Sequence, residues 1–257
     1  MKKLFWVFLA AILMTGCTGN KQQPTVAATD WANTVVYEMN VRQYTPEGTF
    51  AAAQRELPRL KELGIDVVWL MPIYPIGVEG RKGTLGSYYA IKDYTDINPE
   101  FGTLADFDNF LAEAHRLGLK VIIDWVANHT SPDARWVTES PASWYERDAQ
   151  GGLTYTADWS DTANLNYADE GMVKGMQEAM HFWLQRGVDG FRCDAGYMLP
   201  VEAWRYIEAK VRNEYPDTVF LLEGLGGPVD KQTLLLEKAG LNWGYSELFQ
   251  NYSRDEI

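Results

Sequence analysis

Three apolar segments of the chain each end in a carboxylic acid. They read Ile-Ile-Asp at 122–124, Phe-Arg-Cys-Asp at 191–194 and Leu-Leu-Glu at 221–223, so the acids are Asp124, Asp194 and Glu223. In a parallel α/β sheet, ligands bind at the carboxyl ends of the strands. If the three segments are neighbouring strands, the three acids belong to one site.

Arg192 lies two residues before Asp194, and side chains two apart on a strand share a face. An arginine beside a carboxylate keeps it ionised and fixes its rotamer. Asp194 and Glu223 end consecutive strands, about 4.8 Å apart, and cannot both ionise cheaply. We expect Glu223, without the arginine, to hold its proton to the higher pH. A nucleophile and an acid about 5–5.5 Å apart is the arrangement that cleaves glycosidic bonds with retention.

Two other interpretations of these acids are open. Acids at strand ends also cap helices or form surface ion pairs, although three on apolar strands, one of them beside an arginine, favour a site. A metal hydrolase would combine His129 with the three acids. The other histidines are His115 and His181, and no HxH or HExxH pattern occurs, which disfavours a catalytic metal.

The segments that must position these residues alternate between strand and helix patterns. Strands separated by helices imply parallel pairing with right-handed crossovers, and about six βα units follow from residue 31 onward. The stretch 128–169 is too long for an ordinary loop and is expected to be a functional insertion or a small subdomain. The expected strands are 35–39, 65–71, 119–125, 188–194, 219–223 and 241–245, and the expected helices include 57–63, 103–118, 171–187, 201–215 and 229–239.

Several short motifs, in this order, resemble the signatures of the α-amylase family of glycoside hydrolases. Residues 124–129 (Asp-Trp-Val-Ala-Asn-His) resemble the first signature, 190–194 (Gly-Phe-Arg-Cys-Asp) the second, and Glu223 with the run before it the third. Residues 164–166 (Asn-Leu-Asn) resemble a further signature in the inserted domain, and 89–94 resemble the segment whose first tyrosine stacks under the sugar. The resemblance covers essentially everything after residue 31.

This resemblance implies a (β/α)8 TIM barrel, a fold of the α/β class, with an inserted subdomain after its third strand. It further implies retaining action on α-glucosidic bonds of starch or maltodextrins. By position, Asp194 is then the nucleophile and Glu223 the general acid/base. Two alternatives stay open, namely an intramolecular transglycosidase or isomerase of the same family, and a non-catalytic glycan-binding lipoprotein.

The same resemblance assigns supporting roles to four more residues. Arg192 orients and charges the nucleophile, and Asp124 supports the site from behind. His129 hydrogen-bonds a sugar hydroxyl and Tyr89 forms the stacking floor. The alternative for His129 is a purely structural histidine, and the alternative for Tyr89 is a tyrosine of the core.

Two departures concern the structural Ca²⁺ that many family members bind. Asn128 matches one ligand, but Asn164 stands where an aspartate is usual, and Met198 stands where a histidine carbonyl often contributes. An amide in place of a carboxylate lowers the charge that attracts a hard cation. We therefore expect no Ca²⁺ at this place, and the chemistry itself requires no cofactor.

The larger departure is the lack of the family's fourth signature, a His-Asp pair that supplies the third catalytic acid. The acids after Glu223 do not follow a histidine, and six units do not close a barrel, which leaves an open strand edge. We expect the chain to be an amino-terminal piece of a longer enzyme, inactive and poorly soluble by itself. These acids are Asp230, Glu237, Glu247, Asp255 and Glu256.

The amino terminus resembles an export signal. Lys2 and Lys3 precede an apolar run over 4–14, and Thr-Gly-Cys follows at 15–17. This pattern resembles the lipobox of bacterial lipoproteins, with 1–16 as signal peptide, Cys17 as the lipidated residue and 17–30 as a polar tether. Because Thr18 is not aspartate, we expect an outer-membrane anchor, or else a periplasmic location.

Composition excludes several other classes. Hydrophobic residues make up 46% and charged residues 23%, values that exclude a disordered chain, a coiled coil and a polytopic membrane protein. The net charge of −12, without a basic run after the first residues, excludes a nucleic-acid surface. Of the two cysteines, only Cys193 lies in the folded part, so no internal disulfide forms there.

Overall fold

The structure is a computed structural model that describes residues 33–225 and 228–245. The chain divides into two units, residues 1–33 and 34–257, and the second contains the elements described below. The predicted signal peptide, the lipidation of Cys17 and the tether all lie outside the described residues. Among the helices that are described, none has the length and apolar character needed to cross a bilayer.

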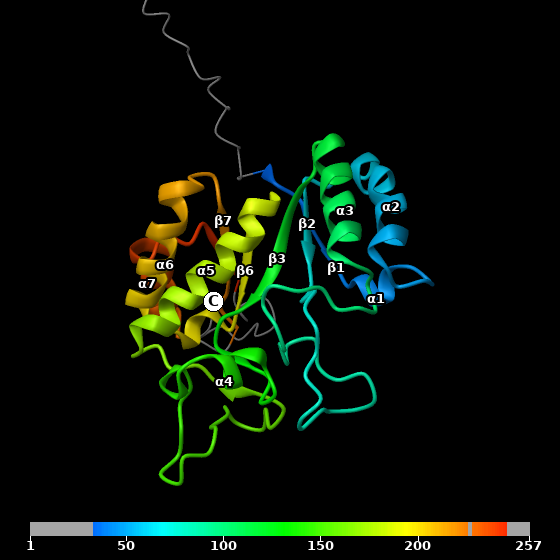
Figure 1. The fold of residues 1–257 in the computed structure, drawn as a ribbon. Helices are drawn as coiled ribbons and strands as arrows, with labels where there is room; N and C mark the ends of the chain where they lie inside the picture. The colour runs from blue at the N-terminus through cyan, green and yellow to red at the C-terminus, as the bar shows by residue number, and fades with distance from the viewer. Residues whose placement is uncertain (1–32, 226–227, 246–257) are drawn as a thin grey trace, which may run out of the picture. The chain divides into compact units, whose positions relative to one another are not determined.

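A parallel sheet forms the centre of the second unit (Figure 1). Within the described residues it has six strands in the order β1-β2-β3-β6-β7-β8, and every neighbouring pair is parallel. It is the curled sheet of an incomplete (β/α)8 barrel, which confirms the predicted fold class. The strands are β1 (Val36–Met39), β2 (Val67–Leu70), β3 (Lys120–Val126), β6 (Gly190–Asp194), β7 (Val219–Glu223) and β8 (Trp243–Tyr245).

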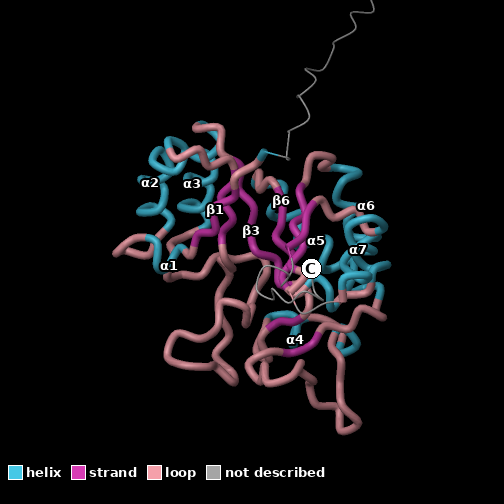
Figure 2. Tube along the Cα trace, turned by 180° about the vertical axis from the view of Figure 1, so that it is seen from behind, coloured by secondary structure: helices cyan, strands magenta, loops and turns pink. Residues whose placement is uncertain are grey.

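Helices connect these strands and flank the sheet, with α2 and α3 beside β1 and with α5, α6 and α7 on the side of β6 (Figure 2). The limits of two of these helices follow from residues that cap helix ends. Thr103 and Asp106 form a reciprocal capping box at the start of α3, and Gly187 at φ 101° ends α5. The helices are α1 (Val41–Tyr44), α2 (Phe50–Glu62), α3 (Leu104–Arg116), α5 (Glu170–Arg186), α6 (Val201–Glu214) and α7 (Val229–Lys238).

The helix predicted around 57–63 is longer than the leucine spacing indicated. It begins at Phe50, because the hydroxyl of Thr49 accepts the backbone N–H of Ala52 and caps the first turn. Phe50 itself is fully buried and packs edge-on against Phe107 of α3. The sequence spacing therefore identified the second half of this helix only.

Side chains along β3 alternate between the inner face of the curled sheet and the face that packs against the helices. Successive strand residues point to opposite faces of a sheet. Trp125 packs against Phe191 and donates its indole N–H to the sulfur of Met176 on α5, so it belongs to the layer between sheet and helices. Its neighbour Asp124 points the other way, to the inner face of the curled sheet, where Arg192 contacts it.

The segment between β3 and α5 carries a small structure of its own. β4 (His129–Thr130) pairs antiparallel with β5 (Ala163–Asn164), and His129 lies opposite Asn164. Between them lie α4 (Arg135–Glu139) and the 3-10 turn η2 (Ala142–Trp144). This is the inserted subdomain expected after the third strand, while its limits of 128 and 169 stay a prediction.

Candidate active site

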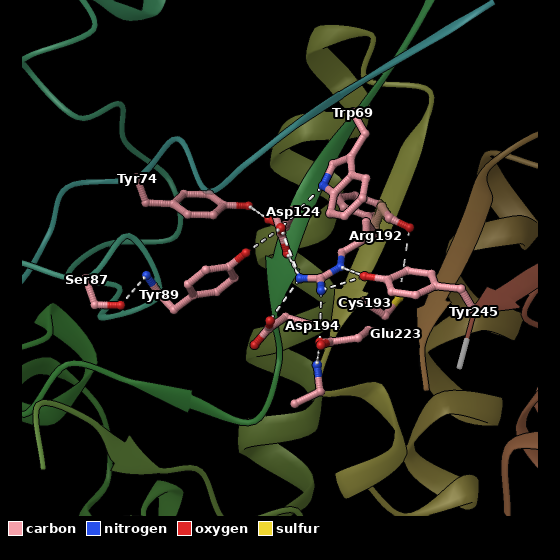
Figure 3. A network of polar contacts seen from close by, with 12 residues as sticks. Trp69, Tyr74, Ser87, Tyr89, Asp124, Arg192, Cys193, Asp194, Glu223 and Tyr245 are labelled. Carbon is pink, nitrogen blue, oxygen red and sulfur yellow. Dashed lines mark hydrogen bonds and ion pairs between the residues drawn. The ribbon is translucent and has the colours of Figure 1, made fainter. Parts of the chain in front are cut away.

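Arg192 of β6 holds the three acids together (Figure 3). Asp194 and Glu223 end their strands as expected, whereas β3 continues to Val126, two residues past Asp124. Its Nη1 lies 2.8 Å and 3.0 Å from the two carboxyl oxygens of Asp124 and 2.9 Å from Oδ1 of Asp194. Its Nη2 lies 2.9 Å from Oε2 of Glu223. The acids come from β3, β6 and β7, which are neighbours in the sheet, as the sequence predicted.

Asp124 is fully buried beneath the other two acids. Its Oδ2 accepts the indole N–H of Trp69 at 3.3 Å and the phenol of Tyr89 at 3.4 Å. Burial raises the pKa of the Asp124 carboxyl to about 6, and Arg192 opposes that rise. Asp124 thus ties the guanidinium of Arg192 to β3, while its supporting role in the chemistry stays a prediction.

The expectation that Arg192 contacts only one of the two acids Asp194 and Glu223 is wrong. We expected Arg192 to contact Asp194 and not Glu223, but one guanidinium reaches both carboxyl groups. Burial is the main influence on Asp194, and with the neighbouring carboxylate of Asp124 it raises the pKa of Asp194 well above the ordinary value, against the pull of Arg192. Asp124 and Asp194, which share Nη1 of Arg192, therefore titrate as an interacting pair.

The residue after Asp194 has an unusual backbone. Ala195 adopts φ 45° and ψ 32°, a left-handed conformation that is rare for a residue with a side chain. Its N–H donates to Oε2 of Glu223 at 2.6 Å. Strained backbone of this kind concentrates at functional sites, where the surroundings hold it in place. Here it links the end of β6 directly to the acid at the end of β7.

A cavity of about 380 Å³ opens above this cluster. Four predicted site residues line it, namely Tyr89, His129, Asp194 and Glu223, whereas Asp124 and Arg192 are buried and do not line it. The remaining lining residues come mainly from two loops and from the turn after β6: Lys82, Ser87, Trp159, Asp161, Thr162, Ala195, Tyr197 and Leu225. The cavity has the size of a small-molecule site with several polar groups converging on it.

His129 is buried in the wall of this cavity, at 3% exposure. Burial lowers the pKa of its imidazole to about 4, so the ring is neutral at pH 7. The amide nitrogen of Asn128 lies 3.2 Å from Nδ1, which then acts as the acceptor and leaves the proton on Nε2. The indole of Trp159 packs against the ring, with centroids 5.4 Å apart. The ring also makes a hydrogen bond with the backbone of Tyr89, so it is held in place, and its contact with a sugar hydroxyl stays a prediction.

The side chain of Asn164, at the place considered for Ca²⁺, makes contacts within the protein. The carbonyl of Asn164 accepts the hydroxyl of Thr156 at 3.1 Å, and its amide donates to Glu146 at 3.3 Å. In the part of the chain that the structure describes, no three His, Cys, Asp or Glu side chains are grouped to hold a metal ion. The expectation that no Ca²⁺ binds at Asn128 and Asn164 stays a prediction.

Sequence reasoning missed several residues around the site. Trp69 lies inside an apolar run and looked like core, yet its ring faces the guanidinium of Arg192 at 4.9 Å. Tyr245 ends the last described strand, and its hydroxyl contacts Arg192. Lys82 and Trp159 lie in irregular loops without periodicity, so only the fold could place them at the cavity. For Trp69 and Tyr245, their position at the carboxyl ends of strands was the available signal.

The family model of the α-amylase catalytic domain matches residues 26–151 and 142–221. The chain therefore belongs to the α-amylase family. Among curated proteins it is similar to an α-1,4-glucan:maltose-1-phosphate maltosyltransferase of Rhodospirillum rubrum, with 34% identity over 86% of this chain and 35% of that enzyme.

Two solved structures are also similar. An α-amylase from Lactobacillus plantarum has 46% identity and a TM-score of 0.72, over 74% of this chain and 45% of that one. A noncanonic maltogenic α-amylase from Thermotoga neapolitana has 33% identity and a TM-score of 0.78, over 86% and 51%. The chain spans about a third of the length of the curated relatives it matches and about half of these two structures.

Proposed function

We propose that this site cleaves α-glucosidic bonds of starch or maltodextrins with retention, with Asp194 as nucleophile and Glu223 as general acid/base. The observation that carries the proposal is that both carboxyl groups line one cavity while a single guanidinium contacts both. Paired carboxyl groups on adjacent strands suit a two-step displacement through a glycosyl-enzyme. Membership of the α-amylase family supports the assignment.

In the first step Glu223 protonates the glycosidic oxygen while Asp194 attacks the anomeric carbon. Arg192 contacts Oδ1 of Asp194, so Oδ2 is the attacking atom. Arg192 and Ala195 both contact Oε2 of Glu223, which assigns the transferred proton to Oε1. The bond to the leaving sugar breaks, that sugar departs as an alcohol, and an ester to Asp194 forms.

In the second step the Glu223 carboxylate removes a proton from an acceptor hydroxyl. The acceptor oxygen attacks the anomeric carbon, the ester breaks, and Asp194 leaves as a carboxylate with Arg192 beside it. Two inversions retain the anomeric configuration. Tyr89 would support the face of the sugar and His129 would hydrogen-bond a hydroxyl.

The acceptor decides between hydrolysis and transfer. Water gives an amylase, and a second sugar or phosphate gives a transferase. The similar solved structures are named amylases, whereas the curated relatives are named maltosyltransferases, so transfer is the second candidate. Anomeric NMR of maltoheptaose reactions, with and without added maltose or phosphate, separates them, because only a transferase makes longer chains or a glycosyl phosphate.

The catalytic proposal is tested with Asp194→Asn and Glu223→Gln in the full-length protein, with maltoheptaose as substrate. We expect Asp194→Asn to lower kcat by on the order of 10⁴-fold or more, and Glu223→Gln by roughly 10²–10⁴-fold. A fluoride leaving group needs no proton, so α-maltosyl fluoride should restore much of the rate of Glu223→Gln and none of Asp194→Asn. Asp108→Asn, which alters a surface ion pair with Arg186, is the matched control.

Two results would overturn this proposal. One is an Asp194→Asn enzyme that keeps its rate. The other is a wild-type protein that binds maltoheptaose without converting it, which would favour a glycan-binding lipoprotein.

We further propose that the protein is exported and anchored to the membrane through lipid on Cys17. The proposal depends on the basic start, the short apolar run and the small residues before the cysteine. Metabolic labelling with a fatty acid should mark the wild type and not Cys17→Ser. Equal labelling of both proteins would contradict it.

A further inference from the structure

Tyr245 contacts Arg192, the cation that the three acids share. Its hydroxyl oxygen accepts from Nε of Arg192 at 3.0 Å and from Nη2 at 2.7 Å (Figure 3). Its ring lies 6.2 Å from that of Trp69, so two aromatic rings border the guanidinium. Tyr245 is not among the residues that line the cavity.

The contacts of Arg192 engage all three of its side-chain nitrogens. Nη1 donates to Asp124 and Asp194, and Nε donates to Tyr245. Nη2 donates to Tyr245 and also pairs with Glu223. A guanidinium has five N–H donors in a fixed plane, so a partner on one edge determines what the other edge can reach. Because the phenol of Tyr245 accepts one N–H of Nη2, only the other N–H of Nη2 remains for Glu223.

The sheet register makes this coupling direct. Glu223 and Tyr245 are paired residues of β7 and β8, so their side chains leave the sheet on the same face. The carbonyl of Tyr245 also accepts the N–H of Gly224, the residue after Glu223, at 2.8 Å. The backbone of Tyr245 thus holds the segment that carries the acid, while its side chain contacts the arginine that pairs with the acid.

We propose that Tyr245 is a positioning residue that acts through Arg192 on the acid/base Glu223. By occupying Nε and half of Nη2, its neutral hydroxyl keeps the guanidinium from pairing fully with Glu223, so that the acid retains the proton it must deliver. This inference rests on the proposed function of Glu223. It assigns a catalytic consequence to a side chain that does not line the cavity.

The test compares Tyr245→Phe with the wild type in the full-length protein. Without the hydroxyl, Nη2 turns toward Glu223 and favours its ionised form. We expect kcat at neutral pH to fall about tenfold, the scale of one hydrogen bond to a charged group. The alkaline limb of the kcat profile should move to lower pH, while KM for maltoheptaose stays within about twofold because Tyr245 does not line the cavity.

A second measurement does not depend on turnover. Nitrogen-15 NMR of the arginine side chains, with Arg192→Lys for assignment, should show two separate Nη resonances for Arg192 in the wild type. In Tyr245→Phe the Nε resonance should shift because Nε loses its acceptor, while the two Nη resonances should stay separate because Asp124 and Asp194 still hold Nη1. The matched control is Tyr167→Phe, which removes a half-buried phenol that donates to the carbonyl of Ala127 at 2.6 Å and makes no contact with Arg192.

The outcomes separate this inference from the proposed function. A wild type without turnover but with the expected NMR change would overturn the function and keep the positioning of Arg192 by Tyr245. An unchanged pH profile with unchanged NMR, or the same pH shift in Tyr167→Phe, would overturn the inference. If Tyr245→Phe fails to fold, Tyr245→Gln replaces it, because glutamine keeps an acceptor oxygen. The alkaline limb of its kcat profile should lie at the same pH as in the wild type, and a shifted alkaline limb in Tyr245→Gln would contradict the inference.

Discussion

The floor and the outer wall of the cavity are built in different ways. The floor consists of Asp194 and Glu223, which end strands β6 and β7 and share a buried arginine. The wall consists of loop residues such as Lys82 and Asp161, 3.5 Å apart, and the Lys82 side chain is 47% exposed. One half of the cavity is fixed by the sheet, and the other by contacts between two loops.

This difference separates chemistry from specificity. Groups that must hold a defined charge and distance lie on strands, where register and burial fix them. Groups that meet the outer part of a substrate lie on loops, which tolerate change without disturbing the strands. Substitutions in the floor should therefore alter stability and turnover strongly, and substitutions in the wall should mainly alter substrate preference.

The largest expected effect comes from removing the cation of the floor. Arg192→Met leaves Asp124 and Asp194 buried without a counter-charge, so we expect the free energy of unfolding at pH 7 to fall by about 3–5 kcal/mol. Chemical denaturation measures it. Arg116→Met, which removes an exposed i,i+3 pair with Glu113, should change stability by less than about 1 kcal/mol. Equal effects of the two changes would contradict a distinction between floor and surface.

His129 predicts an intermediate, pH-dependent effect. Its folded pKa of about 4 lies below the ordinary 6.5, so the unfolded chain binds the proton first. The stability that the neutral ring contributes is complete above pH 6.5 and is lost as the pH falls toward 4, up to about 3 kcal/mol.

The measurement is the difference in unfolding free energy between wild type and His129→Asn, taken from pH 7.5 down to pH 4.5. That difference should shrink as the pH falls, because the variant lacks the titrating ring. His181→Asn, on α5, serves as the control for loss of a histidine elsewhere. A difference that is constant over this range would show that His129 is not held neutral by burial.

The smallest effect is expected in the wall. Lys82 donates to the carbonyl of Asp158 at 2.7 Å and pairs with Asp161; the Asp161 side chain is buried, but that of Lys82 is 47% exposed, so water screens its charge. Lys82→Ala should change stability by less than about 1 kcal/mol. It should also alter the ratio of kcat/KM for maltose and maltoheptaose by a few-fold. A loss of turnover as large as that of Asp194→Asn would erase the distinction between wall and floor.

Much of the floor could be predicted from the sequence because strand periodicity and chain order are local properties. Buried strands show as apolar runs, and an acid at the end of each run marks the ligand-binding edge. The spacing of Arg192 and Asp194 placed both on one face, and the structure shows their ion pair. Spacing along one strand does not tell how far a guanidinium reaches across the sheet, so the contact with Glu223 was missed.

The wall could not be predicted in the same way. Lys82 and Trp159 are 77 positions apart in loops without periodicity, and they meet at the cavity only because the strands beneath bring those loops together. Trp69 and Tyr245 are aromatic residues on strands, which packing alone would explain. Their contacts with Arg192 depend on the curl of the sheet, a property that no single segment contains.

The central claim is that Asp194 attacks the sugar while Glu223 supplies the proton. It can be tested by incubating the full-length protein with 5-fluoro-α-glucosyl fluoride, which slows release of a glycosyl-enzyme, and by peptide mass spectrometry after proteolysis. We predict the mass of one fluoroglucosyl group on the peptide that contains Asp194, and none in Asp194→Asn. The same label on Glu223, or turnover of the fluoride without any labelled peptide, would contradict the account.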